Sequence, residues 1–136
     1  MAQPVTGQLG AEGRYWDALA EGRLVLPRCA GCGRWHWPAV WRCGDCGGWE
    51  HDWTPTALAG SIFSWTRTWH RFGGAESLGS PFVTVLVSLA EVPVRLLGVL
   101  EGDETALGLG AAVTGRIDHT RFGDNAVPAI RWSLAA

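Results

Sequence analysis

The sequence predicts a mainly β protein that consists of a short amino-terminal helix, a small cysteine-rich module and a five-stranded antiparallel barrel. Three observations support this fold class. Four cysteines are grouped in the first third of the chain, a helical pattern occurs only before residue 22, and five stretches of β-favouring residues follow residue 56. The 136 residues suffice for one ordinary domain, or for one small domain joined to a small module.

The amino-terminal segment predicts a short helix over residues 11–21. Tyr15, Trp16 and Leu19 fall on one face of this helix, and Gly22 can end it. Residues 1–9 show no such pattern and are expected to form a loose tail. The stretch contains neither a basic leader nor an apolar run, so we expect no secretion signal here.

The four cysteines form two pairs with the same spacing, Cys29-x2-Cys32 and Cys43-x2-Cys46. Two such thiolate pairs on facing turns can complete a tetrahedral metal site, and the glycine after each pair permits the backbone angles of the turn. Residues 27–50 are too few to bury a core, so a structural ion would supply folding energy, on the order of 10–16 kcal/mol in zinc peptides. We expect Zn²⁺; iron bound as in rubredoxin and a disulfide pairing are the alternatives.

Four sulfurs would fill the coordination sphere of the metal, so neither catalysis by the ion nor ligation by His36 or His51 is expected. The interior of the module, residues 34–42, is expected to run out and back as a small hairpin around Pro38. Trp35 and Trp37 would then share one strand face. No internal repeat is apparent in the chain.

After a connector over residues 48–56 the pattern changes to strands. These are predicted over residues 57–70, 82–89, 93–100, 112–120 and 126–134. Alternation in the first of them places Phe63, Trp65 and Trp69 on one face. Five strands with a long first one favour an OB-like barrel, with a generic β-sandwich or a different small barrel as the alternatives. The expected division is a tail and helix over 1–26, a zinc ribbon over 27–53 and an OB-fold barrel over 54–136.

Charge and composition exclude some classes of function. The net charge is −2, and all 11 basic residues are arginine, which argues against general nucleic-acid affinity. No apolar run is long enough to span a membrane, and Arg95 interrupts the best one. Cysteines kept for a metal indicate a reducing compartment, so we expect a cytoplasmic protein.

Aromatic side chains supply the first group of candidate contacts. Five of the nine tryptophans lie in or beside the ribbon, namely Trp35, Trp37, Trp41, Trp49 and Trp53. So small a module cannot bury all of them, so some must cover the helix, the barrel or another protein. Internal packing is the simpler alternative. We take Trp16, Trp35 and Trp37 as candidate partner or ligand contacts.

A second candidate group lies at the exit of the first long strand and consists of Arg67, Trp69, His70 and Arg71. Guanidinium groups beside aromatic faces can hold a phosphate and stack an adenine. A solvated strand end followed by a mobile loop is the simpler interpretation.

Catalytic signatures are absent from the sequence, which has no glycine-flanked nucleophile serine and no phosphate-binding loop. Asp103 and Glu104 fit turn chemistry. Asp118 and His119 are neighbours in a predicted strand, so they would point to opposite faces and could not readily act together.

The order of helix, ribbon and barrel resembles the domain-of-unknown-function family 35, and specific motifs carry the resemblance. They are Tyr15-Trp16-Asp17-Ala18-Leu19-Ala20-Glu21-Gly22-Arg23-Leu24, the two Cys-x2-Cys-Gly turns with Pro38 between them, Pro81-Phe82-Val83, Leu96-Leu97-Gly98, Leu109-Gly110 and Pro128. The similarity spans about residues 12–134. Members often carry proline where this chain has Gly44, which leaves the ligands intact but makes that turn less rigid.

This resemblance implies a rubredoxin-like zinc ribbon joined to an OB-fold and a role in acyl-CoA metabolism. Family members serve as non-catalytic partners of thiolase-like enzymes, including lipid-transfer-protein-type thiolases and aldolases of steroid side-chain breakdown, and help to form the CoA or substrate site. We therefore expect a non-enzymatic subunit of a hetero-oligomer, with acyl-CoA as a candidate ligand. The alternatives are a MaoC-type enoyl-CoA hydratase as the partner, single-stranded nucleic-acid binding, and electron transfer by iron; autonomous catalysis on acyl-CoA is disfavoured.

Overall fold

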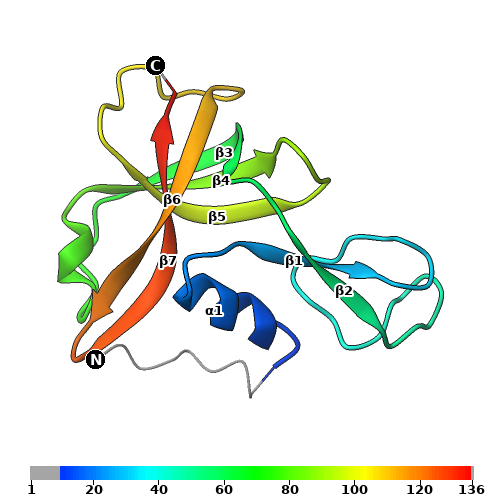
Figure 1. Cartoon of the computed structure of the whole chain (residues 1–136). Helices are drawn as coiled ribbons and strands as arrows, with labels where there is room; N and C mark the ends of the chain where they lie inside the picture. Colours follow the sequence, from blue (N-terminus) through cyan, green and yellow to red (C-terminus); the bar gives the residue numbers. More distant parts are fainter. Residues whose placement is uncertain (1–9, 136) are drawn as a thin grey trace.

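The computed structural model describes residues 10–135 and is built mainly from strands (Figure 1). The expected tail over residues 1–9 lies outside the described residues. In chain order the elements are α1 (Gly13–Ala20), β1 (Val25–Cys29), β2 (His51–Pro55), β3 (Ala59–Thr68), the short 3-10 helix η1 (Glu76–Leu78), β4 (Phe82–Leu89), β5 (Arg95–Glu101), β6 (Ala112–Phe122) and β7 (Asn125–Leu134). The predicted helix and the five predicted strands after residue 56 are all present.

The last five strands close into a ring in the order β3-β4-β5-β7-β6. Four of the five pairings are antiparallel, as expected, but β5 and β7 run parallel and pair only over Val99–Glu101 with Arg131–Ser133. The parallel pairing arises because β6 carries the chain back across the molecule before β7 begins. The mainly β class with a closed five-stranded sheet is confirmed, with this one pairing different from the prediction.

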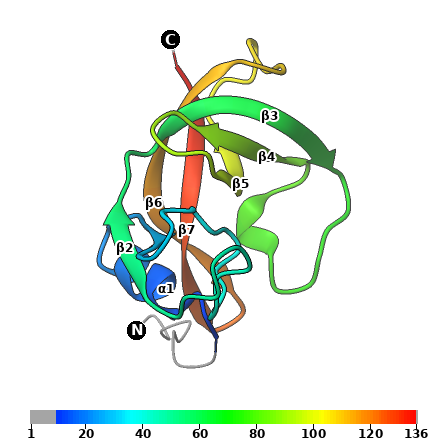
Figure 2. The same cartoon turned by 90° about the vertical axis from the view of Figure 1, so that its right-hand side faces the viewer.

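The long strand β3 bends where it crosses β4, and Figure 2 shows it arching over its neighbour. The register shifts between Ile62 and Ser64, so Phe63 sits in a bulge. Ile62 is buried and Phe63 is half exposed, whereas Trp65 packs against the core, so the prediction that Phe63 shares a face with Trp65 is wrong. Trp69 lies beyond the end of β3 at Thr68. Gly60 permits the close crossing, because a Cβ atom there would lie 2.1 Å from the carbonyl oxygen of Ser88.

The core of the ring comes from alternating apolar side chains. In β4, Val83, Val85 and Val87 are buried while the residues between them are half exposed, as the period of two in a strand requires. Trp132 of β7 fills the centre and has no exposed surface.

The helix and the ribbon pack beside the ring rather than inside it (Figure 1). Tyr15, Ala18 and Leu19 are the buried face of α1, and the helix ends before Gly22, whose φ is +83°. Leu24 and Leu26 around the start of β1 join the same buried cluster as the strands of the ring. The division of the chain into three parts at residues 26 and 53 stays a prediction.

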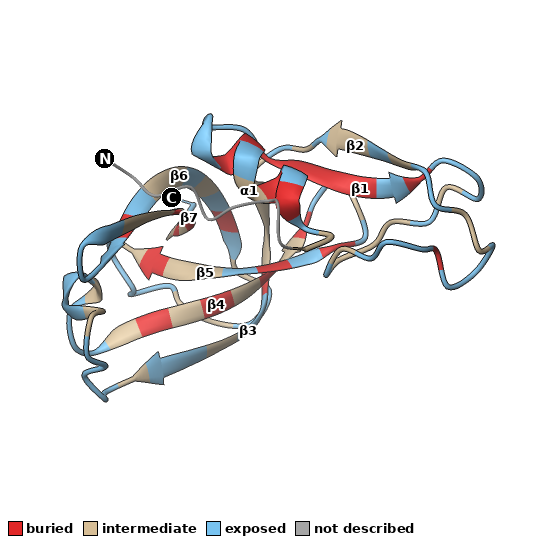
Figure 3. Ribbon diagram, turned by 90° about the horizontal axis from the view of Figure 1, so that it is seen from below, coloured by how far each residue is buried: buried red, intermediate tan, exposed pale blue. Residues whose placement is uncertain are grey.

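The ribbon is a two-stranded antiparallel sheet of β1 and β2 whose far end carries the cysteine turns. The hairpin expected over residues 34–42 is not formed; instead, Trp35 of this segment makes an isolated bridge to Arg28 of β1. Pro38 has no N–H to donate, which works against a strand pair at this point. Figure 3 shows the inner end of β1 buried and the loops at the tip largely exposed.

No helix among residues 10–135 combines the length and the apolar character needed to cross a membrane.

Candidate metal centre

The structure brings the four cysteines together at the tip of the ribbon. Their sulfur atoms all lie within 4.8 Å of one another, with 3.5 Å between Cys29 and Cys46 and 3.6 Å between Cys32 and Cys43. A tetrahedron of Zn–S bonds has sulfur-to-sulfur edges of about 3.8 Å, since each bond is about 2.3 Å long. The quartet therefore fits a closed four-sulfur metal site, with Cys29 and Cys43 buried and Cys32 and Cys46 exposed.

Each Cys-x2-Cys-Gly turn, called a knuckle below, is built by the same backbone contacts. In the first, Cys29 N donates to Arg34 O at 2.8 Å and Gly33 N donates to Cys29 O at 2.9 Å. In the second, Cys43 N donates to Gly48 O at 2.8 Å and Gly47 N donates to Cys43 O at 2.9 Å. The two glycines have φ values of +79° and +78°, a region that side-chain-bearing residues rarely adopt, so glycine is required after each pair.

Backbone N–H groups prepare the buried sulfurs for a cation. Those of Cys32 and Gly31 help to lower the pKa of Cys29 to about 6, and those of Cys46 and Asp45 lower the pKa of Cys43 to about 7. The pKa of Cys32 is raised to about 12, because desolvation and the neighbouring sulfurs outweigh the N–H of Arg34 that favours its thiolate. Four thiolates at this spacing therefore coexist only around a positive charge, which a divalent metal supplies.

Two further contacts surround the quartet. Arg34 of the first knuckle pairs with Asp45 of the second at 2.5 Å, on the surface. His36 and His51 face each other with ring centroids 5.7 Å apart, and His51 Nε2 lies 3.1 Å from the carbonyl oxygen of Trp41. Among the described residues, the cluster of close ligand atoms consists of the four sulfurs and includes neither histidine.

One feature of the ribbon was missed in the sequence. The pattern Arg-Cys-x2-Cys-Gly-x-Trp occurs twice, from Arg28 to Trp35 and from Arg42 to Trp49, so the expectation that the chain has no internal repeat is wrong. The signal was present as two eight-residue segments of the same spacing. The Cys-x2-Cys-Gly spacing alone does not reveal the repeat; the arginine and the tryptophan that flank each pair complete it.

The ribbon tryptophans divide into an inner and an outer group. Trp16, Trp35, Trp37 and Trp53 are partly buried against the core, and Trp37 lies 4.4 Å from the ring of Tyr15. Trp41 and Trp49 are 65% and 66% exposed and border a surface hollow of about 300 Å³ together with Val40. These last three residues, Val40, Trp41 and Trp49, are called the ribbon patch below. The sequence predicted Trp35 and Trp37 as candidate contacts, but the ribbon patch exposes more apolar surface to solvent.

The second candidate group does not form one site. The guanidinium of Arg67 pairs with Glu104 at 2.7 Å and lies over the ring of Trp65. It is therefore engaged by contacts within the protein. His70 and Arg71 line a different hollow of about 280 Å³ with Phe72, and Trp69 is 70% exposed. The structure therefore brings His70 and Arg71 together and separates Arg67 from them.

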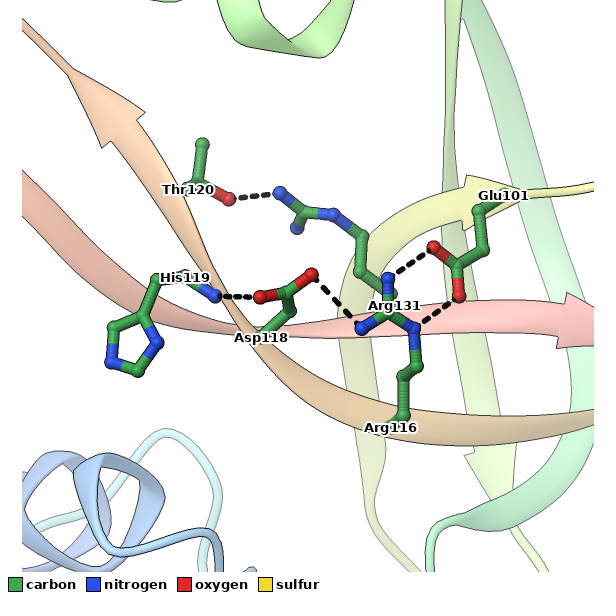
Figure 4. Close-up of polar contacts among 6 residues, drawn as sticks. All are labelled: Glu101, Arg116, Asp118, His119, Thr120 and Arg131. Carbon is green, nitrogen blue, oxygen red and sulfur yellow. Dashed lines mark hydrogen bonds and ion pairs between the residues drawn. The ribbon is translucent and has the colours of Figure 1, made fainter.

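Two acidic residues of the barrel, Glu101 and Asp118, are held in contacts with Arg116. Figure 4 shows Arg116 between Glu101, at 2.6 Å, and Asp118, at 2.9 Å. Asp118 also accepts the backbone N–H of His119, which together with Arg116 holds the pKa of Asp118 below its usual range. Arg131 donates to the hydroxyl of Thr120, and burial lowers the pKa of Arg131.

The turn after β5 behaves as its sequence predicts. The carboxylate of Asp103 accepts the backbone N–H of Thr105 at 2.9 Å, and the side-chain and backbone bonds from Thr105 lower the pKa of Asp103. Glu104 is the partner of Arg67. Both acids thus have structural roles in the protein.

Comparisons with known proteins agree with this description. Residues 16–51, which contain all four cysteines, match the family described as "ChsH2, rubredoxin-like zinc ribbon domain". No curated protein is similar enough in sequence to match the chain. The chain is similar in fold to the solved structure named "Ltp2-ChsH2(DUF35) aldolase", with a TM-score of 0.80, 24% identity, and coverage of 98% of this chain and 100% of that one.

A second similar structure is that of a protein of unknown function from the DUF35 family of Sulfolobus solfataricus, with a TM-score of 0.58 and 20% identity over 96% of this chain and 87% of that chain. Both structures include the ribbon as well as the barrel within the matched length. The resemblance to the domain-of-unknown-function family 35 is therefore confirmed, in sequence over the zinc ribbon and in fold over nearly the whole chain.

Proposed function

We propose that the chain is a non-catalytic accessory subunit that binds a thiolase-like or aldolase enzyme of acyl-CoA or steroid side-chain metabolism. The observation that carries the proposal is the fold match, which covers nearly all of this chain and all of a chain in the structure named "Ltp2-ChsH2(DUF35) aldolase". Because the match covers nearly the full length of both chains, we propose that this chain is a separate subunit, as the matched chain is in its complex. We further propose that it works in the cytoplasm, where its cysteines stay reduced.

Cys29, Cys32, Cys43 and Cys46 would hold a structural Zn²⁺. The ion would fold the tip of the ribbon and leave no coordination position open for substrate. Its contribution to function is therefore to fix the loops that carry the ribbon patch. A rigid aromatic surface loses little side-chain entropy when it binds, which favours it as a docking site.

The absence of catalysis is supported by how the reactive side chains are used. All four cysteines belong to the metal quartet. Among the described acids, Asp118, Glu101 and Asp103 are engaged by Arg116 or by Thr105, and their pKa values are lowered by these bonds. Carboxylates of lowered pKa are poor general acids near neutral pH.

The test is co-expression with a candidate thiolase-like or aldolase partner, followed by size-exclusion chromatography and an activity assay. We expect a stable complex and an enzyme that loses activity without this chain. The Trp41→Ala variant should weaken the complex, because it removes an exposed indole from the ribbon patch; hot-spot truncations of this kind typically cost about 2 kcal/mol or more.

Leu109→Ala is the matched control, since Leu109 is 74% exposed on the barrel and should be neutral. Trp69→Ala reports on an exposed indole outside the ribbon. If only Trp69→Ala lost binding, the docking face would lie on the barrel and not on the ribbon patch. If no such enzyme co-elutes with the wild-type chain and activity is indifferent to it, the proposal is wrong.

A finer part of the proposal is that the chain helps to form the CoA site of its partner. His70 and Arg71 line a hollow with Phe72 and Glu76, in which the guanidinium of Arg71 offers a contact for a phosphate and the ring of Phe72 a surface for the adenine. Acyl-CoA should then bind the complex more tightly than either subunit alone, and Arg71→Gln should reduce that difference in calorimetry. Equal affinity of the wild-type complex and the isolated enzyme would argue against this part alone.

A further inference from the structure

Each knuckle of the ribbon carries one arginine that makes the same pair of contacts. The Nε–H of Arg28 donates to the carbonyl oxygen of Gly33 at 2.8 Å, and its guanidinium carbon lies 5.4 Å from the ring centroid of Trp35. The Nε–H of Arg42 donates to Gly47 O at 3.1 Å, and its guanidinium carbon lies 5.9 Å from the centroid of Trp49. The two copies have different surroundings, so the arrangement is a property of the knuckle itself.

The position of the contact explains what it does. Each arginine directly precedes the first sulfur ligand of its knuckle, and each accepting glycine directly follows the second. The side-chain hydrogen bond therefore links the residue before the first sulfur ligand to the residue after the second. It adds to the backbone hydrogen bonds that shape the turn. The glycine also makes room for the guanidinium, because Arg28 Nη2 lies 3.3 Å from where a Cβ of Gly33 would be, and Arg42 Nη2 lies 3.0 Å from that of Gly47.

Charge acts in the same direction as geometry. Four thiolates around one divalent cation leave the site with two surplus negative charges. Arg28 and Arg42 each bring one positive charge to a knuckle, and the indole over which each guanidinium lies helps to keep it in place.

We infer that Arg28 and Arg42 are positioning residues of the metal site, each of which holds the two sulfurs of its own knuckle at ligand distance and thereby slows the release of the metal. The inference rests on the proposal that the four cysteines hold a metal, but not on the identity of any partner enzyme. It also gives Trp35 and Trp49 an internal role, as the surfaces on which the arginines lie.

The experiment uses the full zinc-loaded chain and measures the rate at which zinc passes to a chromophoric chelator. Arg28→Gln and Arg42→Gln should each release zinc about fivefold faster, since a hydrogen bond of this kind contributes about 1 kcal/mol, and the double variant should be faster than either. Arg23→Gln is the matched control, because Arg23 is an exposed arginine that pairs with Glu21 outside the ribbon; its release rate should equal that of the wild type.

Two further measurements separate positioning from general stability. Co²⁺-substituted Arg→Gln variants should show shifted ligand-field and thiolate charge-transfer bands, whereas a loss of stability elsewhere in the fold would leave these bands unchanged. Arg28→Lys and Arg42→Lys keep the positive charge. A lysine ammonium group, however, cannot donate the hydrogen bond and at the same time lie flat on the indole as a planar guanidinium does, so each variant should still release zinc faster than the wild type.

Trp49→Leu keeps the inference testable if an arginine variant fails to fold, because Trp49 is two-thirds exposed and its removal leaves the core intact. This variant should also release zinc faster than the wild type. Release rates equal to the wild type in all zinc-loaded variants, or full rescue by lysine, would overturn the inference alone. A wild-type chain that binds no metal would overturn both the inference and the proposed zinc site.

Discussion

At the scale of single residues, the packing around Trp132 is close. This indole is wholly buried, and two glycines on neighbouring strands, Gly98 and Gly115, face it. A Cβ at Gly98 would lie 2.6 Å from Trp132 Cδ1, and one at Gly115 would lie 2.9 Å from Trp132 Cζ3. The ring can thus enclose a tryptophan only because the strands beside it carry no side chain at these two positions.

Gly98→Ala should destabilise the protein by about 1–3 kcal/mol, because the added methyl group has no space between the indole and the backbone of Ile130. Urea unfolding followed by circular dichroism measures the change. Gly108→Ala is the matched control, since nothing lies within 4 Å of a Cβ at Gly108. A similar loss of stability in both variants would contradict the packing argument.

Tyr15 offers a pH test, because it is the only tyrosine of the chain and burial raises its pKa to about 12. The folded state keeps the phenol proton to a higher pH than the unfolded state, whose tyrosine titrates near about 10. The contribution of Tyr15 to stability is therefore complete below about pH 10 and is lost as the pH rises towards about 12.

Tyrosinate absorbance should show this difference directly, with a midpoint near 12 in the native protein and near about 10 in guanidinium chloride. Equal midpoints in the two conditions would mean that the phenol is not buried against the ribbon.

At the scale of elements, the ribbon and the ring are stabilised by different means. The ring is stabilised by an apolar core of residues such as Val85, Leu96 and Trp132, which α1 and the base of β1 also join. The tip of the ribbon has few buried side chains and depends on the cysteine quartet. Trp37 of the ribbon lies against Tyr15 of α1, so the two elements are in direct contact.

Removal of the metal by a chelator under reducing conditions should therefore unfold the ribbon tip while the ring keeps its structure. Tryptophan emission should shift to longer wavelength as Trp35 and Trp37 become hydrated, and the β-sheet signal in circular dichroism should largely persist. Re-addition of zinc should restore the emission. Simultaneous loss of both signals would show that the ring needs the ribbon in order to fold.

The elements also show what the sequence could predict and what it could not. The alternation in β4 and the cysteine spacing are local patterns, so the strand over residues 82–89 and the sulfur quartet could be located from the sequence. The bulge at Phe63 could not, because the aromatic alternation continues through it and only the pairing with β4 shows the shift. The parallel pairing of β5 with β7 depends on how the whole ring closes, and no local pattern encodes that.

At the scale of the whole molecule, the ribbon is an arm anchored at one end. Leu24 and Leu26 join its base to the core shared with the ring, while the loops of the tip extend away from it (Figure 1). The ribbon patch lies on these loops. An arm with an anchored base and a metal-fixed tip presents its aromatic side chains in one orientation, which favours binding to a preformed surface.

Formation of the proposed complex should therefore shield tryptophan from acrylamide. In the free chain the quencher should reach Trp41 and Trp49, and in the complex it should reach them less. The decrease should be smaller with Trp41→Ala, whereas Trp132, which is buried in either state, should not contribute. Unchanged quenching in a complex that does form would place the docking face elsewhere.

The uneven depth of the four sulfurs has a consequence of its own. Cys32 and Cys46 are exposed while Cys29 and Cys43 are buried. A thiophilic heavy ion such as cadmium can therefore bind the two exposed sulfurs while the two buried sulfurs still hold the original metal. Thiolates favour soft cations. In a cell exposed to such an ion, we therefore expect this protein to stay folded with the heavy ion bound in place of the original metal.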